Sequence, residues 1–310
     1  MGERGRLVAS SASCTCAAAP AWFHSALNDT PEHRDAVVDG HRIHLRCWGR
    51  VENPGLVLVH GGSAHSGWWD HIAPLLAGSY RVVALDLTGH GDSDRRPRYG
   101  LTAWAAEVLG AAAAAGISGK PTVIGHSMGG WVTATTALHF GDQLAGIVII
   151  DSTLRDEPDE RSRFRGRGRA SVYESRETIL SRFTTVPEQA VLLPYIAEHV
   201  AAESIRQTDD GWQWKFDPAL FDDSFFDEGW PEELTLADHL PHISGRVAFL
   251  RAEQGLVPVT MREEVKALLG HRGPVVDLPD TGHHPMLDQP LSLVTALRTV
   301  LAQWEITPPQ

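Results

Sequence analysis

Cysteine is scarce in this chain of 310 residues, which contains only Cys14, Cys16 and Cys47. Two of the three lie near the N-terminus, so we expect no disulfide framework, and the reducing cytoplasm is the location that fits best. Long hydrophobic runs are missing too, since no stretch approaches the roughly 18 apolar residues of a membrane span. The formal net charge is -12, which argues against a nucleic-acid partner and against an anionic membrane surface.

The rest of the composition is that of an ordinary globular protein, with 43% hydrophobic and 21% charged residues. A chain of this length accommodates one large domain, or a core with an insertion. We expect residues 1–30 to be a disordered leader. A signal peptide is the weaker alternative, because Ser and Thr interrupt what would be its apolar segment.

Short apolar runs recur along the chain, each ending in polar residues or glycine: GLVLVHGG, YRVVALDL, PTVIGHS, LAGIVIIDS, GRVAFLRAE and GPVVDLPDTGHH. Continuous apolar runs are typical of strands buried on both faces, so they predict an α/β fold with a mostly parallel central sheet flanked by helices. HRIHLRCW alternates instead, as a half-buried strand does, and Leu101–Ala115 reads as an intervening helix.

This rhythm stops between Ser152 and about Leu240. We therefore expect a core of residues 31–152 and 241–310, with a mainly helical cap inserted at 153–240. The alternating arginines Arg161–Arg169 read as a solvated loop. The aromatic run that follows includes Trp212 and Trp214, and its members either line a substrate pocket or form the small core of the cap: Trp212, Trp214, Phe216, Phe221, Phe225, Phe226 and Trp230.

The stretch VIGHSMGGW places Ser127 between an apolar strand and a helix, with Gly125 and Gly129 on either side. Only three residues remain to reverse the chain, so Ser127 is expected at the apex of a strained turn with its hydroxyl exposed. The arrangement is the G-x-S-x-G nucleophile elbow, in which a serine acts as the nucleophile. Met128 is expected to be the first residue of the helix, with its N–H pointing toward the position of the Ser127 hydroxyl.

Other polar residues follow the predicted strands, and the carboxyl ends of parallel strands meet at one edge of a sheet. Asp151 follows VII, Glu253 follows AFLRA, and His283 and His284 follow DLPDTG. The order serine, carboxylate, histidine is that of a hydrolase in which histidine activates serine and the carboxylate orients the histidine. The HGG loop would supply a second oxyanion donor through Gly62.

The motifs HGG, DLTGHGDSD, GHSMGG and GHHPMLDQP, in that order, resemble the α/β-hydrolase superfamily, in its capped serine esterase and lactonase-like branch. The resemblance covers roughly Val37–Ile150 and Arg246–Trp304 and selects His283 rather than His284. It implies structural roles for His60 and His126, and loop-stabilising roles for Asp86 and Asp94.

The sequence departs from the family pattern at one point, because Gly255 stands at the position where the family usually carries the acid of its catalytic triad. Asp151 and Glu253 are the two candidates that remain. We favour Asp151, because a short carboxylate at the very end of an apolar strand needs a partner and an imidazole N–H is a suitable one. Glu253 has other partners beside it in Arg251 and Gln254.

The leading hypothesis is a serine hydrolase that cleaves a carboxylic ester or lactone of moderate size and apolar character through an acyl-enzyme, with no metal or organic cofactor. A carbon–carbon bond hydrolase of the β-diketone type and a cofactor-free haloperoxidase-like enzyme stay open as alternatives. So does a ligand-binding protein without activity, which the empty acid slot motivates. The sequence names no partner beyond a small-molecule substrate and leaves a homodimer open.

Overall fold

The computed structural model describes residues 19–155, 171–221 and 235–306, and its centre is an eight-stranded sheet. The strands lie in the order β1-β2-β4-β3-β5-β6-β9-β10. Within this described sheet the β1–β2 and β2–β4 pairs are antiparallel and the other five pairs are parallel, so the expected mostly parallel sheet is confirmed. The strands are β1 (Glu32–Val38), β2 (His41–Trp48), β3 (Gly55–Val59), β4 (Arg81–Leu85), β5 (Thr122–His126), β6 (Gly146–Ile150), β9 (Val247–Gln254) and β10 (Val275–Gly282).

The four central strands β3, β4, β5 and β6 are buried at every position. Alternate side chains of a strand enter different halves of the core: Val57 and Val59 join one apolar cluster, while Leu56 and Leu58 join the other. Burial on both faces explains why these strands are continuous apolar runs in the sequence rather than alternating ones.

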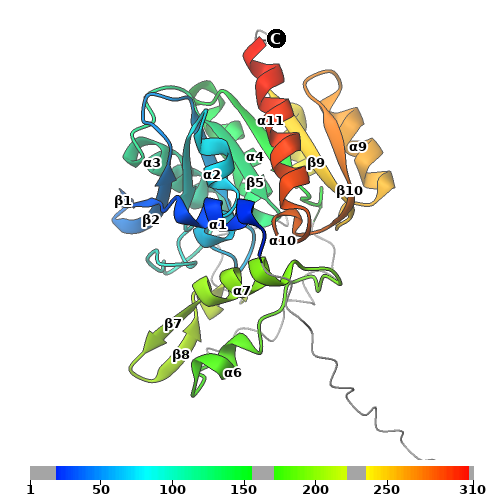
Figure 1. Ribbon diagram of the computed structural model, residues 1–310. Helices are drawn as coiled ribbons and strands as arrows, with labels where there is room; N and C mark the ends of the chain where they lie inside the picture. Colours follow the sequence, from blue (N-terminus) through cyan, green and yellow to red (C-terminus); the bar gives the residue numbers. More distant parts are fainter. Residues whose placement is uncertain (1–18, 156–170, 222–234, 307–310) are drawn as a thin grey trace, which may run out of the picture.

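Helices cover both faces of this sheet (Figure 1). The first cluster includes side chains of α3 (Leu101–Ala114), α4 (Met128–Phe140) and α9 (Val259–Leu269). The second includes side chains of α1 (Ala21–Asn28), α2 (Ala73–Ala77), α10 (Pro285–Asp288) and α11 (Pro290–Ile306). The sheet is therefore the middle of three layers, as expected of an α/β fold. None of the helices within the described ranges is long and apolar enough to cross a membrane.

The described part of the segment between β6 and β9 lies beyond the carboxyl ends of the strands (Figure 1), and it contains a short hairpin besides helices. Its described elements are α6 (Arg176–Leu180), α7 (Pro194–Glu203), β7 (Ile205–Thr208), β8 (Gly211–Trp214) and η3 (Pro218–Phe221). Strands β7 and β8 form an antiparallel hairpin that pairs Thr208 with Gly211 across a two-residue turn. Runs of four residues are too short to show a strand period, which is why the sequence did not reveal them. We call this segment the insertion.

The last part of the expected insertion, 153–240, contacts the core. Helix α8 (Leu236–His239) and η5 (Leu240–His242) bury Leu236, Ala237 and Leu240 in the same cluster as the helices of the core. This stretch therefore packs against the core. The alternating arginines and the aromatic residues Phe225, Phe226 and Trp230 lie outside the described residues.

The expectation of a disordered leader through residue 30 is wrong for its last part. Helix α1 forms there, with Phe23 and Ala26 buried on one side. The Phe23 ring lies 4.9 Å from Tyr195 of the insertion and 5.9 Å from His71 of the core. The N-terminal segment is rich in Ala and Ser, and this composition led us to overlook Phe23, whose contacts hold the helix against the rest of the chain. Residues 1–18 lie outside the described part of the chain.

Because Phe23 is 4% exposed, we expect Phe23→Ala to lower the free energy of unfolding by about 3 kcal/mol, the range for buried Phe→Ala changes. Ser25→Ala, an exposed change in the same helix, is the matched control and should cost less than about 0.5 kcal/mol. Urea unfolding followed by fluorescence measures both. Equal effects of the two changes would show that α1 does not pack in solution.

Candidate active site

Ser127 occupies the turn between β5 and α4 with φ 54° and ψ -122°, a backbone conformation that L-residues avoid. The turn is closed by backbone packing: a Cβ on Gly125 would lie 2.1 Å from the carbonyl oxygen of Gly129, and a Cβ on Gly129 would lie 2.5 Å from that of His60. The two flanking glycines are thus required by the close approach of strand and helix.

The strained turn is also held by hydrogen bonds. The N–H of Ser127 donates to the carbonyl of Ile150 at 3.0 Å. The carbonyl of Ser127 accepts from the N–H of Gly130 at 2.8 Å and from the hydroxyl of Ser152 at 2.7 Å. Ser152 is a supporting residue that the sequence did not reveal, because a serine after a strand carries no signal of its own.

His283 follows β10 and lies between Ser127 and Asp151. Its Nε2 is 3.0 Å from Ser127 Oγ, and its Nδ1 is 2.8 Å from Asp151 Oδ2. A carboxylate only accepts hydrogen bonds, so Nδ1 carries the proton and Nε2 is the acceptor for the serine hydroxyl. The imidazole is 3% exposed, whereas Ser127 is partly open to solvent. The geometry is that of a serine poised to lose its proton to a base.

Asp151 follows β6 with φ 44°, and its carboxylate is fully buried. Oδ1 accepts from the N–H of Ala252 at 3.1 Å, and Oδ2 accepts from the N–H of Leu256 at 2.8 Å as well as from His283. Glu253 is exposed instead, and its Oε2 accepts from the N–H of Asp280 at 2.9 Å. The structure therefore brings Asp151, and not Glu253, to the histidine.

Gly255 explains the empty acid slot. A Cβ built on Gly255 would lie 2.1 Å from Asp151 Oδ2 and 2.6 Å from Asp151 Cγ. The carboxylate that arrives from β6 thus fills the space that a side chain at position 255 would enter. The Asp151 carboxylate therefore requires glycine at position 255, and only one of the two positions can carry the acid.

The loop after β3 carries the expected oxyanion donor and is oriented by His60. The Nε2 of His60 accepts from the N–H of Leu87 at 3.1 Å, so Nδ1 bears the proton and donates to the carbonyl of Gly61 at 2.7 Å. Burial lowers the pKa of His60, which keeps the ring neutral. The carbonyl of Gly61 and the N–H of Gly62 belong to one peptide plane and point in opposite directions, so His60 also fixes the direction of that N–H.

This loop passes beside the nucleophile, because a Cβ on Gly61 would lie 3.2 Å from Ser127 Cβ. Met128 is the first residue of α4, where a helix leaves its N–H groups without intrahelical partners. Within the described residues, the N–H groups of Gly62 and Met128 donate no hydrogen bond. Both are available to a ligand at Ser127.

Comparison with known proteins identifies the family of this fold. The profile of the alpha/beta hydrolase family matches residues 56–297.

The chain belongs to the alpha/beta hydrolase family.

A pimeloyl-[acyl-carrier protein] methyl ester esterase of Aliivibrio salmonicida is 24% identical over 81% of this chain and 93% of its own length. A serine hydrolase-like protein of Mus musculus is 34% identical, over 38% of each chain. The chain thus spans about a third of the length of the first curated relatives it matches. Among solved structures, an E-2-(acetamidomethylene)succinate hydrolase superposes with TM-score 0.77 at 18% identity, over 88% of this chain and 99% of that one. This last likeness supports the fold alone.

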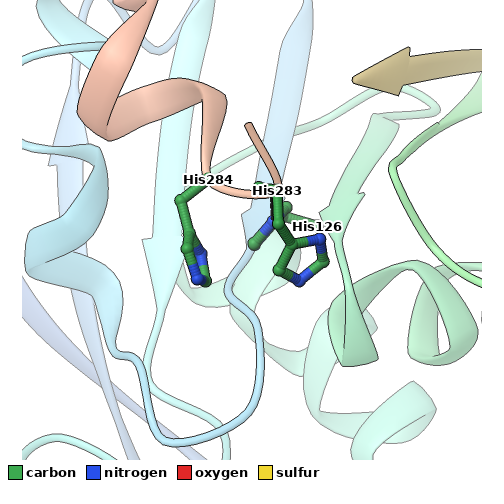
Figure 2. Close-up of side chains that lie close together, drawn as sticks. All are labelled: His126, His283 and His284. Carbon is green, nitrogen blue, oxygen red and sulfur yellow. Dashed lines mark hydrogen bonds between the residues drawn. The ribbon is translucent and has the colours of Figure 1, made fainter. Parts of the chain in front are cut away.

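Two further histidines surround His283 in this alpha/beta hydrolase (Figure 2). The Nε2 of His126 donates to the carbonyl of His283 at 2.7 Å, and burial lowers the pKa of His126, so a neutral ring holds the backbone of its neighbour. One ring nitrogen from each of His126, His283 and His284 lies within 4.8 Å of the others, close enough to hold a metal ion. Both nitrogens of His283 are already engaged by Ser127 and Asp151, so an ion there would break the arrangement.

The two tryptophans expected to line a pocket lie on β8. The ring of Trp214 is 6.3 Å from Phe183, Phe183 is 6.5 Å from Trp68, and Trp68 is 5.4 Å from His284. Trp214 is thus connected to the site through two intervening aromatic rings. Trp212 pairs by its backbone with Tyr173, at 2.9 Å in both directions. Trp68 was not singled out in the sequence analysis.

Asp86 and Asp94 hold the loops beside the site, as the family resemblance implies. Asp86 Oδ1 accepts from the N–H of Ser66 at 2.6 Å, and its Oδ2 accepts from the N–H of Asp92 at 2.9 Å. Burial opposes ionisation of Asp86, but these bonds and the one from His44 hold its pKa well below the usual range. Asp94 Oδ2 accepts from the N–H of Arg42 at 2.7 Å.

Asp288 closes the loop that carries His283. Its Oδ2 accepts from the N–H of Gly282 at 2.6 Å, while its Oδ1 has no hydrogen-bond partner among the described residues. Burial raises the pKa of Asp288 to about 6. The carboxyl therefore binds a proton in the folded chain at a pH where it is ionised in the unfolded chain.

The first prediction from this site concerns the carboxylate. Asp151→Ala should lower kcat on a p-nitrophenyl ester by on the order of 10³–10⁴, the scale of a lost orienting acid. Since positions 151 and 255 address the same space, Asp151→Ala combined with Gly255→Asp should recover at least about tenfold of that loss. Asp151→Ala combined with Gly119→Asp is the control, because Gly119 lies in open space and should give no recovery. Equal recovery in the two double variants would contradict the shared site.

The second prediction concerns pH. A raised pKa means that the stability contributed by Asp288 is fully present below about pH 4 and is lost as the pH rises through about 6. At pH 8 the free energy of unfolding of Asp288→Asn should therefore exceed that of the wild type by about 1–2 kcal/mol, and its unfolding temperature should be higher. Near pH 4 the two proteins should differ little. Asp142→Asn, at an exposed carboxyl, is the control for added amide and lost charge. Thermal unfolding measured across this pH range tests the assignment. The same pH dependence of the unfolding temperature in Asp288→Asn and Asp142→Asn would contradict it.

Proposed function

We propose that this alpha/beta hydrolase is a serine hydrolase that cleaves a carboxylic ester or lactone through an acyl-enzyme. The observation that carries the proposal is the unbroken chain of hydrogen bonds from Asp151 through His283 to Ser127, beside the N–H groups of Gly62 and Met128. The pimeloyl-[acyl-carrier protein] methyl ester esterase similar over most of its length supports an ester as the substrate class. The proposed location is the cytoplasm, from the cysteine content, and the proposed cofactor requirement is none.

Each group has a defined step in this mechanism. Ser127 Oγ attacks the ester carbonyl carbon as its proton passes to His283 Nε2, and Asp151 stabilises the imidazolium that forms. The carbonyl oxygen becomes an oxyanion that accepts hydrogen bonds from Gly62 and Met128. When the tetrahedral intermediate collapses, the bond to the alcohol oxygen breaks and Nε2–H protonates that oxygen. Water then attacks the acyl-enzyme with His283 as base, which releases the acid and restores the serine.

The insertion supports an apolar substrate of moderate size. Trp68, Phe183 and Trp214 form a series of aromatic rings that leads from the region of His284 to β8. Aromatic side chains of this kind line sites for apolar ligands and, in this proposal, receive the acyl or alcohol part of the substrate. Trp212 is assigned to the same wall as Trp214, because alternate residues of a strand share a face. In this proposal the insertion acts as a cap.

The alternatives differ in what they require of the site. A ligand-binding protein without activity was motivated by the glycine in the acid slot, and the position of Asp151 removes that motive. A β-diketone hydrolase and a cofactor-free haloperoxidase-like enzyme would use the same three side chains, so only substrates separate them from an esterase.

A fluorophosphonate probe tests the mechanism and p-nitrophenyl esters of rising chain length, with lactones, test the substrate class. We expect the probe to add to Ser127, identified by peptide mass, and Ser127→Ala to abolish both labelling and ester hydrolysis with an unchanged unfolding temperature. Ser181→Ala, a serine on the insertion, is the control and should behave as the wild type. Turnover of Ser127→Ala within about tenfold of wild type would refute the nucleophile, because triad removal costs several orders of magnitude. Labelling at Ser127 without hydrolysis of any ester or lactone would refute the substrate class alone.

A further inference from the structure

A pair of histidines that the proposed mechanism does not use lies on the β1–β2 hairpin. The Nδ1 of His33 on β1 is 3.0 Å from the Nε2 of His44 on β2, and the ring centroids are 5.2 Å apart. His33 is exposed and His44 is partly exposed. Two imidazole nitrogens face each other at the surface, where an ion from solution reaches them.

The second nitrogen of His44 has a fixed partner. Its Nδ1 lies 2.9 Å from Oδ2 of the buried Asp86, so Nδ1 carries the proton and Nε2 presents a lone pair toward His33. A carboxylate behind a histidine in this way is the usual support of a metal-ligating imidazole, because it sets the tautomer and the ring orientation and raises the basicity of the free nitrogen. Asp86 is itself held by the N–H groups of Ser66 and Asp92, so the support is rigid.

We propose that His33 and His44 bind one divalent transition ion such as Zn²⁺, through His33 Nδ1 and His44 Nε2, with Asp86 as the carboxylate that orients His44. Zinc lies about 2.0–2.1 Å from histidine nitrogen, so two nitrogens on one tetrahedral ion are roughly 3.4 Å apart. The observed separation of 3.0 Å needs to widen by a few tenths of an ångström, which rotation of the exposed His33 ring provides. Water completes the coordination.

The charges around the pair suit a cation. The Arg46 guanidinium acts on His33, but it is neutralised by Asp70 and Glu203, each at 2.7 Å. Asp86 adds a buried negative charge directly behind His44. Asp70, Glu203 and Asp86 therefore compensate the charge of Arg46 next to the two histidines.

A second geometry uses the other side of His44. Ligand atoms of His44, Asp86 and Asp92 also lie within 4.8 Å of one another. Asp86 is already saturated by His44 and two backbone N–H groups, and Asp92 Oδ2 pairs with Lys215 at 2.8 Å. An ion there would have to displace all of these bonds, whereas an ion between His33 and His44 displaces one. The observations therefore favour the histidine pair.

Binding at this pair would fasten β1 to β2 and, through His44 and Asp86, to the loops that carry Ser66 and Asp92. The loop that leads from β3 to Ser66 also carries Gly62, but neither histidine takes part in the proposed reaction. The inference concerns stability rather than catalysis and does not depend on the proposed function.

Isothermal titration of the whole protein with ZnCl₂ tests the inference. We expect one ion per chain whose Kd rises at least about tenfold in His33→Ala and in His44→Ala, and by less than about twofold in His41→Ala, a histidine of the same hairpin. Since His44→Ala removes a hydrogen bond to Asp86, ¹⁵N-histidine NMR of the unaltered protein provides the second measurement: Zn²⁺ should shift His33 Nδ1 and His44 Nε2. No saturable binding, or no shift of these two nitrogens, overturns the inference. A Kd raised by His44→Ala and unchanged by His33→Ala also overturns it and assigns the ion to His44, Asp86 and Asp92.

Discussion

The buried carboxylate of Asp151 is the constraint on which the rest of the site depends. An ionised carboxylate removed from water is costly unless hydrogen bonds replace the water it loses. Two backbone N–H groups and one imidazole N–H do so here. They come from Ala252 near the end of β9, from Leu256 in the loop after β9 and from His283 after β10. Satisfying one charge at the end of β6 therefore draws the ends of three strands together. The position of His283 over Ser127 follows from that convergence.

The same constraint decides which residues are small. Gly255 leaves room for the Asp151 carboxylate, and Gly125 and Gly129 leave room for the strand-to-helix turn that raises Ser127. Ser127 and Asp151 both adopt positive φ without being glycine, which costs backbone energy that the surrounding hydrogen bonds and packing must offset. The strained backbone at these two positions and the glycines near them have the same cause, because in both cases the backbone must pass close to a reacting group.

Much of the core was predictable because it obeys simple periodicities. The continuous apolar runs of β3–β6 predict strands buried on both faces. Ser127 is identifiable because a strand and a helix flank its turn, which glycines bound. The choice between Asp151 and Glu253 was only weakly decided by sequence, since both follow parallel strands. Two observations in space separate them: the distance from Asp151 to His283, and the missing room at Gly255.

The parts that escaped prediction depend on single long-range contacts. Helix α1 is fastened by Phe23, whose partners His71 and Tyr195 are distant in sequence, and no local pattern encodes such a pairing. The β7–β8 hairpin is too short to show a period, and its chain continues into polar contacts with the core, such as the N–H of Asp217 with the carbonyl of Gly89 at 2.7 Å. The orientation of the Gly61–Gly62 peptide depends on the tautomer of His60, which the N–H of Leu87 sets from the loop after β4.

The division between core and insertion separates two tasks. Ser127, His283, Asp151, Gly62 and Met128 all belong to the core, where strand ends and helix starts fix them. The insertion meets this core through both polar and apolar contacts. Arg46 binds Glu203, and His65 lies 3.0 Å from the hydroxyl of Ser204. Ile196 and Val200 share an apolar cluster with Trp69. These contacts fasten α7 and the residue that follows it, whereas Trp212 and Trp214 lie on the β7–β8 hairpin. Under the proposed function, the aromatic residues of the hairpin can therefore change without altering the groups around Ser127, so substrate choice can vary while the chemistry stays fixed.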